Sequence, residues 1–448
     1  MRNRLEAFAL RHPDIFYWRI ILPLQTLLLL AYCAPLYGFS ALLGPINSVF
    51  SPEQTRGAMA GVLTGSLLFL GVGFGALFSD SLLRLAKSPA RLLIALNIAV
   101  LVVFSVGGLA CELDNLWLFL LGFALPTGLI FSNIFSLAMR QLMGWANHFN
   151  RAGLQAGFSG LVFGLWGALF SFYGASLEEY FGLPLFLCLC GVAILLTGLA
   201  ATFFYFAPPQ AATSGQLESK SAEIIALDVA QILKLAPYWL FLVFFLLFLM
   251  PGFGFKIVVQ EFSQHVFQTS GHASAMIAIA FLLSYGLSRL IFGLLSDSFN
   301  SRPLYLGFVL VQAICLLIAA LTLPSNQNVV FFTVLMCLIG GSFAAGKSCW
   351  VLLQLKLYGP ESYNNAVRAT MPAFGLAGLL GPLTLNWTLD KADMLTATST
   401  WFYSMSAALG ICFFIVLMLK KVDYARVAVG QPQPISITLR SKDPSTRF

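Results

Sequence analysis

The sequence predicts an all-α membrane protein with twelve transmembrane helices arranged in two bundles of six. Three observations support this prediction. Of the 448 residues, 59% are hydrophobic and only 10% are charged, with a mean hydropathy of +0.85, whereas soluble globular chains carry about 25% charged residues. Apolar runs long enough to span a bilayer follow one another along the chain, and Lys and Arg gather in alternate connections. This composition excludes a soluble enzyme, a secreted disulfide scaffold and a disordered chain.

Apolar runs separated by turn residues place the helices in order. The first six are expected at 19–44, 55–78, 90–110, 116–140, 153–173 and 183–205, and the last six at 237–260, 272–295, 303–324, 328–353, 366–388 and 399–420. The first run is too long for a cleaved signal peptide, so we expect it to be retained.

A hydrophilic segment at 206–236 separates an N-terminal bundle, residues 1–205, from a C-terminal bundle, residues 237–420. The second part of this segment is amphipathic, which is typical of a short interfacial helix; a plain linker is the alternative. Residues 421–448 form a tail, which we expect to be cytoplasmic.

The distribution of Lys and Arg predicts the orientation in the membrane. Twenty of the 25 basic residues fall on the side that holds both termini, and only Arg56 and Lys391 fall on the other. Because cytoplasmic loops are enriched in Lys and Arg, we expect both termini in the cytoplasm and the protein in the cell membrane. The net charge of +7 then faces anionic lipid and needs no nucleic-acid partner.

A short motif recurs at the end of the second helix of each half. Asp80 is followed by Arg84, and Asp297 is preceded by Gly293 and followed by Arg302. An aspartate at the cytoplasmic end of a helix can pair with an arginine and with a neighbouring helix terminus. We therefore predict that these five residues form a conformational latch, with ordinary acidic loop residues as the alternative.

This duplicated loop resembles the signature of the major facilitator superfamily. Further short motifs resemble the oxalate/formate antiporter family of bacterial anion porters and the related monocarboxylate porters; they are Tyr37-Gly38-Phe39-Ser40, residues 151–157, Pro237-Tyr238-Trp239, residues 288–293, residues 340–343, Tyr358-Gly359 and residues 378–382. The resemblance implies two six-helix bundles that rock about a central site by alternating access.

In the antiporter family, an arginine of the eighth helix and a lysine of the eleventh hold the anion. Arg289 matches the arginine, but residues 369–375, which correspond to the eleventh-helix stretch, contain no lysine. This difference argues against small dicarboxylates as cargo. The monocarboxylate porters carry an aspartate one turn before the arginine, where this chain has Tyr285. The resemblance therefore implies anion exchange or facilitated diffusion rather than proton symport.

Three cations lie inside predicted spans, namely Lys256, Arg289 and Lys347. A charge at the bilayer centre costs at least about 2.5 kcal/mol on insertion scales, so such residues tend to face the bundle interior. Arg289 and Lys347 lie about 12 and 13 Å from the cytoplasmic ends of their helices. For Lys256, which follows Pro251-Gly252 near the outer face, reaching out to the external interface is the simpler account.

The acidic residues all fall in loops, tails or span ends, so the predicted cations have no carboxylate in the middle of a span. We predict that the cargo supplies the counter-charge, as a carboxylate held bidentately by Arg289. Pairing of Arg289 with backbone carbonyls, or its extension into a wet vestibule, is the alternative. Lys347 is expected to supply a second charge, and the phenols of Tyr32, Tyr37 and Tyr285 could donate hydrogen bonds to the anion.

We therefore expect a secondary active or facilitative transporter of a small organic anion, working by exchange and as a monomer in membrane lipid. Three other functions stay open: a carrier of amino acids or another zwitterion, a multidrug exporter, and a sensor with a transporter fold. An exporter of cations would need a buried carboxylate, and a sensor would need a large soluble domain; the sequence predicts neither. We expect no catalytic residues, no metal site and no cofactor, because no nucleophile–base set or ligand cluster stands out.

Overall fold

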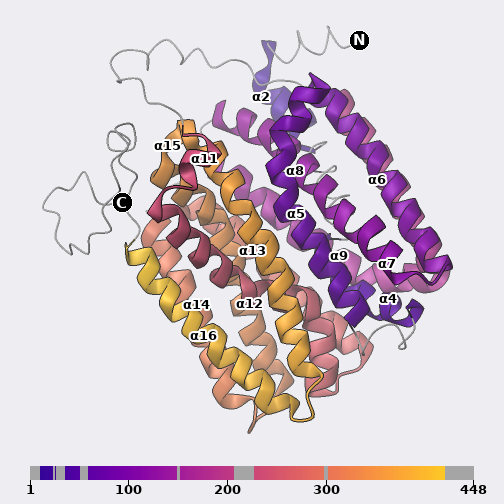
Figure 1. Ribbon diagram of the computed structural model, residues 1–448, viewed down its shortest axis with the longest axis vertical. Coiled ribbons are helices and arrows are strands. Elements are labelled where there is room, and N and C mark those ends of the chain that lie inside the picture. Colours follow the sequence, from indigo (N-terminus) through magenta and orange to yellow (C-terminus); the bar gives the residue numbers. More distant parts are fainter. Residues whose placement is uncertain are drawn as a thin grey trace, which may run out of the picture.

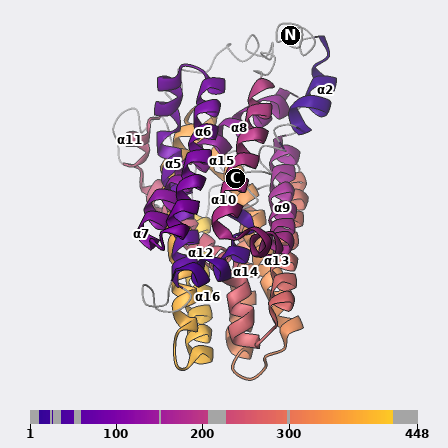
Figure 2. The ribbon, with the colours of Figure 1, turned by 90° about the vertical axis from the view of Figure 1, so that its right-hand side faces the viewer.

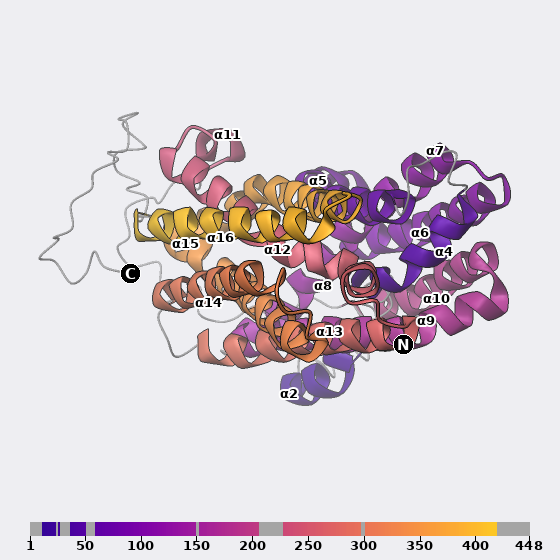
Figure 3. The same cartoon turned by 90° about the horizontal axis from the view of Figure 1, so that it is seen from below.

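A computed structural model of the chain describes residues 11–23, 26, 36–50, 59–148, 152–205, 227–296 and 301–418. Within these ranges every regular element is a helix, which confirms the predicted all-α class. The helices of the N-terminal half, drawn in indigo to magenta, lie beside those of the C-terminal half, drawn in pink to yellow (Figure 1). The view from below separates the same two groups (Figure 3).

The N-terminal half contains five long helical stretches. They are α5 (Met59–Ala86), α6 (Pro89–Glu112), the stretch formed by α7 (Leu116–Leu118), η3 (Phe119–Ala124) and α8 (Leu125–His148), then α9 (Ala152–Phe181) and α10 (Leu183–Phe203). The region of the first predicted span, 19–44, is described in pieces: α2 (Pro13–Phe16) precedes it, η1 (Tyr17–Ile21) and η2 (Phe39–Leu42) overlap it, and α4 (Leu43–Val49) extends beyond it. Tyr32 lies outside the described residues.

The C-terminal half begins with the short α11 (Val229–Ile232), which Asp228 and Gln231 cap reciprocally. Its long helices are α12 (Ala236–Phe267), α13 (Gly271–Ser296), α14 (Ser301–Thr322), α15 (Val329–Leu389) and α16 (Met394–Met418). Figure 2 shows α12, α14 and α16 extending downward beyond the N-terminal half. The described part of the segment between the bundles is held on α15, because Ser362 and Asn365 bond the backbone of Leu227.

Helix α15 holds both the tenth and the eleventh predicted spans. Gln354 donates a hydrogen bond of 2.6 Å to the hydroxyl of Thr370, although a straight helix would separate these residues by about 24 Å. The chain of α15 therefore folds back between them, and Val329–Trp350 and Ser362–Leu389 cross as separate spans.

Eleven stretches of the described helices are long and apolar enough to cross a membrane, and the shorter Phe39–Val49 belongs to the predicted first span. Several helices run further than the apolar runs predict. Helix α5, for example, continues to Ala86, so Asp80 lies in its last two turns. A helix can extend beyond the hydrocarbon because water and headgroups solvate its polar side chains.

Glycines bring the two halves into contact. A Cβ at Gly164 of α9 would lie 2.5 Å from the Cα of Gly286 in α13, and a Cβ at Gly73 of α5 would lie 2.5 Å from the Cα of Gly375 in α15. Small residues at these positions let the helix backbones approach closely. Helices α9 and α13, and α5 and α15, therefore form the interface between the halves.

The two ends of the helices carry different polar groups. We call the end that carries Asp80, Arg140 and Arg368 the basic end, and the end that carries Asn47 and Glu261 the distal end. Gly61, which bonds Asn47, and Asp80 are 19 residues apart on α5, a separation of about 28 Å. The two ends are therefore roughly one bilayer core apart.

Candidate functional site

Tyr285 of α13 lies at the centre of the interface between the two halves and is fully buried. Its hydroxyl lies 3.4 Å from the hydroxyl of Tyr37, which comes from the N-terminal half. The Arg289 guanidinium, one turn further along α13, donates to the same hydroxyl at 3.5 Å. Two of the predicted tyrosines and the predicted arginine thus meet at one point.

The three intramembrane cations converge on this tyrosine. The Lys256 ammonium, the Lys347 ammonium and the Arg289 guanidinium carbon lie 5.9, 5.7 and 6.0 Å from the centre of the Tyr285 ring. They come from α12, α15 and α13 respectively. The C-terminal half therefore supplies all three positive charges, and the N-terminal half faces them with Tyr37.

Lys256 does not reach out to the membrane interface, so the simpler account from the sequence is wrong. Its side chain is 2% exposed, and its ammonium lies 3.2 Å from the centre of the Tyr37 ring and 4.4 Å from that of Phe69. An ammonium above an aromatic face is attracted by the ring quadrupole. The aromatic rings of the N-terminal half thus hold Lys256 inward.

Lys347 is also held among aromatic rings. Its ammonium lies 4.5 Å from the centre of the Phe374 ring, 5.0 Å from Phe343 and 5.2 Å from Phe253, and the residue is 8% exposed. Phe374 lies in the eleventh span, in the stretch that corresponds to the one with the lysine in the oxalate/formate antiporter family. Lys347 therefore extends from the tenth span towards that wall of the site.

A cavity of about 310 Å³ adjoins the cations. Tyr37, Arg289, Lys347 and Ser348 line its inner part, and Arg140 and Arg368 line the part near the basic end. Four lining residues are basic, and none of the described lining residues is acidic. Arg140 and Arg368 pair with Asp80, so the uncompensated positive charge of the wall lies in its inner part, at Arg289 and Lys347.

Arg289 makes two long hydrogen bonds with described residues. Besides Tyr285, its described hydrogen-bond partner is the hydroxyl of Ser348, at 3.4 Å, and it forms no ion pair with a described residue. Both bonds are longer than the usual 2.7–3.2 Å. Most of the hydrogen-bonding capacity of the guanidinium thus stays available to a molecule in the cavity.

Gly160 of α9 makes room for the Arg289 side chain. A Cβ at Gly160 would lie 2.4 Å from Cδ and from Nε of Arg289, closer than real Cβ contacts allow. The guanidinium also lies 5.7 Å from the ring centre of Phe163, one turn along the same helix. Arg289 belongs to the C-terminal half, but its side chain therefore rests on the N-terminal half.

Asp80 of the predicted latch forms ion pairs, but with other partners than Arg84. Asp80 pairs with Arg140 of α8 at 2.7 Å and with Arg368 of α15. Arg84 is exposed and forms no ion pair with a described residue. The Asp80–Arg368 pair joins the two halves at the basic end, which the local motif alone does not indicate.

The second copy of the motif is described only at its edges. Gly293 is buried in α13, and Arg302 donates to the Leu417 carbonyl near the end of α16. Asp297 lies outside the described residues. The prediction of a latch in this half therefore stays a prediction.

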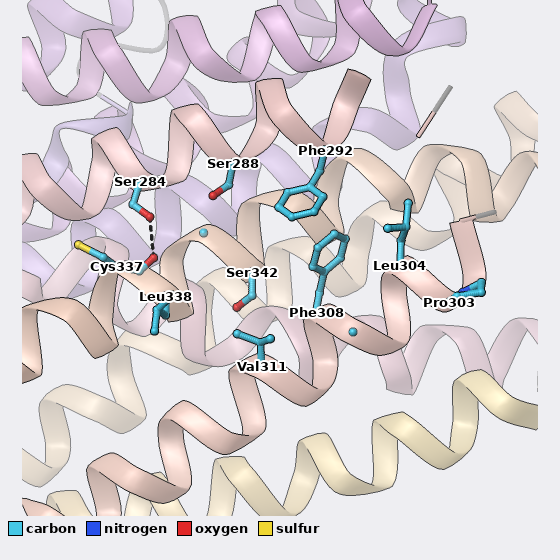
Figure 4. Close-up of a pocket in the computed structure, with 12 residues that line it drawn as sticks. Ser284, Ser288, Phe292, Pro303, Leu304, Phe308, Val311, Cys337, Leu338 and Ser342 are labelled. Atoms are coloured by element: carbon cyan, nitrogen blue, oxygen red, sulfur yellow. Dashed lines mark hydrogen bonds between the residues drawn. The ribbon is translucent and has the colours of Figure 1, made fainter. Parts of the chain in front are cut away.

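A second hollow, of about 670 Å³, lies between α13, α14 and α15 on the outside of the C-terminal half. Figure 4 shows it lined by apolar and hydroxyl side chains, with Ser284 donating to the carbonyl of Cys337 at 2.7 Å. Val311 and Leu338, which line it, are 41% and 47% exposed. None of its described lining residues is charged, so it does not resemble the central cavity.

Among the described residues, no group of three His, Cys, Asp or Glu could hold a metal ion. Glu261 is a buried acidic residue near the distal end of a described transmembrane helix. Glu261 is 8% exposed in α12, because that helix continues to Phe267 rather than ending at residue 260.

Comparison with known proteins identifies the family to which the chain belongs. The sequence model of the family described as the Major Facilitator Superfamily matches residues 27–382. The solved structure of the human organic anion transporter MFSD10 (TETRAN) has a TM-score of 0.60 and 15% identity, covering 89% of this chain and 99% of that chain. None of the curated proteins matches the sequence.

The proton:xylose symporter XylE, bound to 6-bromo-6-deoxy-D-glucose, has a TM-score of 0.65 and 13% identity, covering 88% of this chain and 94% of that chain. A double tryptophan mutant of XylE has a TM-score of 0.65 and 15% identity, covering 92% and 99%. At these identities the likeness concerns the fold alone.

Asp80→Asn is expected to loosen the basic end by removing both of its ion pairs. Because these pairs are partly exposed, with side-chain exposures of 16–40%, they contribute together about 1 kcal/mol. The labelling rate of a cysteine at Val367, which lines the cavity near this end, should therefore rise about fivefold, measured in a variant whose native cysteines are replaced.

Arg84→Gln is the matched control, since Arg84 lies in the same motif without an ion pair to a described residue. It should leave the labelling rate unchanged. An Asp80→Asn rate equal to that of the control would show that the ion pairs do not hold the two halves together.

Proposed function

Because this chain belongs to the major facilitator superfamily of membrane transporters, we propose that it carries a small organic anion, a carboxylate, across the membrane by alternating access and exchange. The positive charge at the inner part of the central cavity carries this proposal. Arg289 and Lys347 line the cavity, Lys256 lies beside it, and none of the described lining residues is acidic. An anion entering here gains the attraction of several cations in a medium of low dielectric constant.

Arg289 is the residue best suited to hold the carboxylate. A guanidinium presents two parallel N–H donors to a carboxylate, which sets the orientation of the cargo as well as its charge. The two long bonds from Arg289 to Tyr285 and Ser348 can give way to shorter ones with the cargo. The hydroxyls of Tyr37 and Tyr285 are close enough to add hydrogen bonds of their own.

The position of the cations suits a transporter that rocks between two states. The charges come from α12, α13 and α15, whereas Tyr37 and Gly160 come from the opposite half. A carboxylate bound to Arg289 therefore lies between the halves, where it can favour their approach. We propose that the basic end faces the cytoplasm, in agreement with the distribution of Lys and Arg.

Exchange is favoured over proton symport by the composition of the cavity wall. Proton symport would require a titratable carboxylate beside Arg289 to carry the proton. Tyr285 occupies that position. One structure of similar fold is described as an organic anion transporter, which is compatible with the proposed cargo. The other is described as a proton:xylose symporter, and its cargo has no charge for three cations to hold.

Arg289→Gln is expected to abolish trans-stimulated uptake of the transported carboxylate. Loss of a bidentate, charge-assisted interaction costs about 2–3 kcal/mol, which lowers the affinity about 30- to 150-fold. Proteoliposomes preloaded in turn with mono-, di- and hydroxycarboxylates and with amino acids would be assayed for counterflow.

The matched control is again Arg84→Gln, an exposed arginine outside the cavity, which should transport as the unchanged protein does. Counterflow that survives Arg289→Gln would contradict the proposal. Counterflow restricted to amino acids would favour the zwitterion carrier instead.

Gly160→Ala is expected to reduce transport without removing any charge. The added methyl group collides with Arg289, so the guanidinium must move or the halves must separate. We expect the concentration for half-maximal uptake to rise about tenfold, since overpacking typically costs 1–3 kcal/mol. Gly307→Ala is the control, because a Cβ there has no atom within 4 Å; equal effects of the two variants would show that Gly160 does not position Arg289.

A further inference from the structure

Glu261 of α12 is a buried acidic residue that the proposed anion site does not use. Its side chain is 8% exposed at the distal end, whereas the central cations lie deeper in the bundle. One carboxyl oxygen accepts a hydrogen bond of 3.0 Å from the side-chain amide of Asn47. The other is buried and has no hydrogen-bond partner among the described residues.

Asn47 links three elements across the interface. Its side-chain nitrogen donates to Glu261 of the C-terminal half, and its side-chain oxygen accepts from the backbone N–H of Gly61 in α5, at 2.8 Å. Asn47 itself belongs to α4, at the end of the first span. The Asn47–Glu261 bond therefore joins the two halves at the distal end, as Asp80–Arg368 joins them at the basic end.

The contacts of Asp80 and of Glu261 differ in whether a positive charge compensates the carboxylate. Asp80 is partly exposed and meets two arginines, so its carboxylate is compensated. Glu261 meets a neutral amide and has one buried oxygen without a described partner. Burying an ionised carboxylate in such surroundings costs several kcal/mol, whereas a protonated carboxyl is far less costly to bury.

Glu261 forms no ion pair with a described residue. Asp390, at the C-terminal end of α15, acts on Glu261 with a charge of the same sign. His265, one turn along α12, directs its ring nitrogen to the backbone carbonyl of Glu261 at 2.9 Å. The described parts of α4 and of the first turns of α5 carry no titratable residue, and Glu53 and Arg56 lie outside the described residues.

We propose that Glu261 is a proton-binding site whose occupancy holds the distal gate closed. When the halves meet at this end, Glu261 binds a proton from the distal solution and is buried as the neutral acid beside Asn47. When they separate, Glu261 meets water and releases the proton to the same side. Acidity on the distal side therefore favours closure there.

This inference needs only the alternating-access fold and not the proposed cargo. The site exchanges protons with one side of the membrane, so it regulates opening and moves no proton across. It is therefore compatible with anion exchange, and either proposal can fail without the other.

Spin labels at Leu113→Cys and Ala392→Cys, in the full chain with native cysteines replaced, would report the distance between the halves at the distal end. Both positions are exposed, on opposite halves. Without any anionic cargo, the closed population should grow as the pH falls from 8 to 5, by at most about tenfold per pH unit for one proton. Glu261→Gln, which resembles the protonated acid, should stay closed at both pH values.

Glu179→Gln is the matched control, because Glu179 is exposed at the distal end of α9; it should keep the full pH response. A Glu261→Gln protein that keeps this response overturns the proposal. If Glu261→Gln does not fold, Asn47→Asp serves instead. Two facing carboxylates should hold the gate open at pH 8 and close it at pH 5, and an Asn47→Asp protein that stays closed at pH 8 overturns the proposal as well.

Discussion

The structure depends on keeping positive charge inside a membrane protein. Lys256, Arg289 and Lys347 surround one buried phenol, and each is costly to place in hydrocarbon. Aromatic faces offset part of the free-energy cost of burying the two lysine charges. The Arg289 side chain packs against Gly160 and lines the cavity. The glycines of α9 fit this arrangement, because Gly160 leaves room for Arg289 and Gly167 leaves room for Tyr37.

Contacts at the two ends complete this arrangement. Asp80–Arg368 at the basic end and Asn47–Glu261 at the distal end each join residues of opposite halves. A transporter that opens to one side at a time must break one contact while it keeps the other. The contact at the basic end is an ion pair, and the one at the distal end depends on a neutral acid in our proposal, so salt and pH act on different ends of the molecule.

Much of this could be predicted from the sequence, for physical reasons. Apolar runs give the helices, and a charge within a run must face the interior, so Arg289 and Lys347 were identifiable. Lys256 was misplaced because position along a helix does not reveal that Tyr37 and Phe69, distant in the chain, would hold its ammonium. Asp80–Arg368 and Asn47–Glu261 join residues more than 200 positions apart, and no local pattern indicates such pairs. The role of Gly160 as the support of Arg289 could not be predicted either, because the two residues are 129 positions apart in the chain.

The central claim is that the positive cluster binds an anion, and anomalous diffraction from crystals grown in iodide tests it most directly. Iodide is a monovalent anion that can be located without knowledge of the cargo. We predict an iodide peak in the cavity between Arg289 and Lys347, which is absent in Arg289→Gln. Iodide found only at surface sites or beside Arg140 and Arg368, with the central cavity empty of it, would contradict the account.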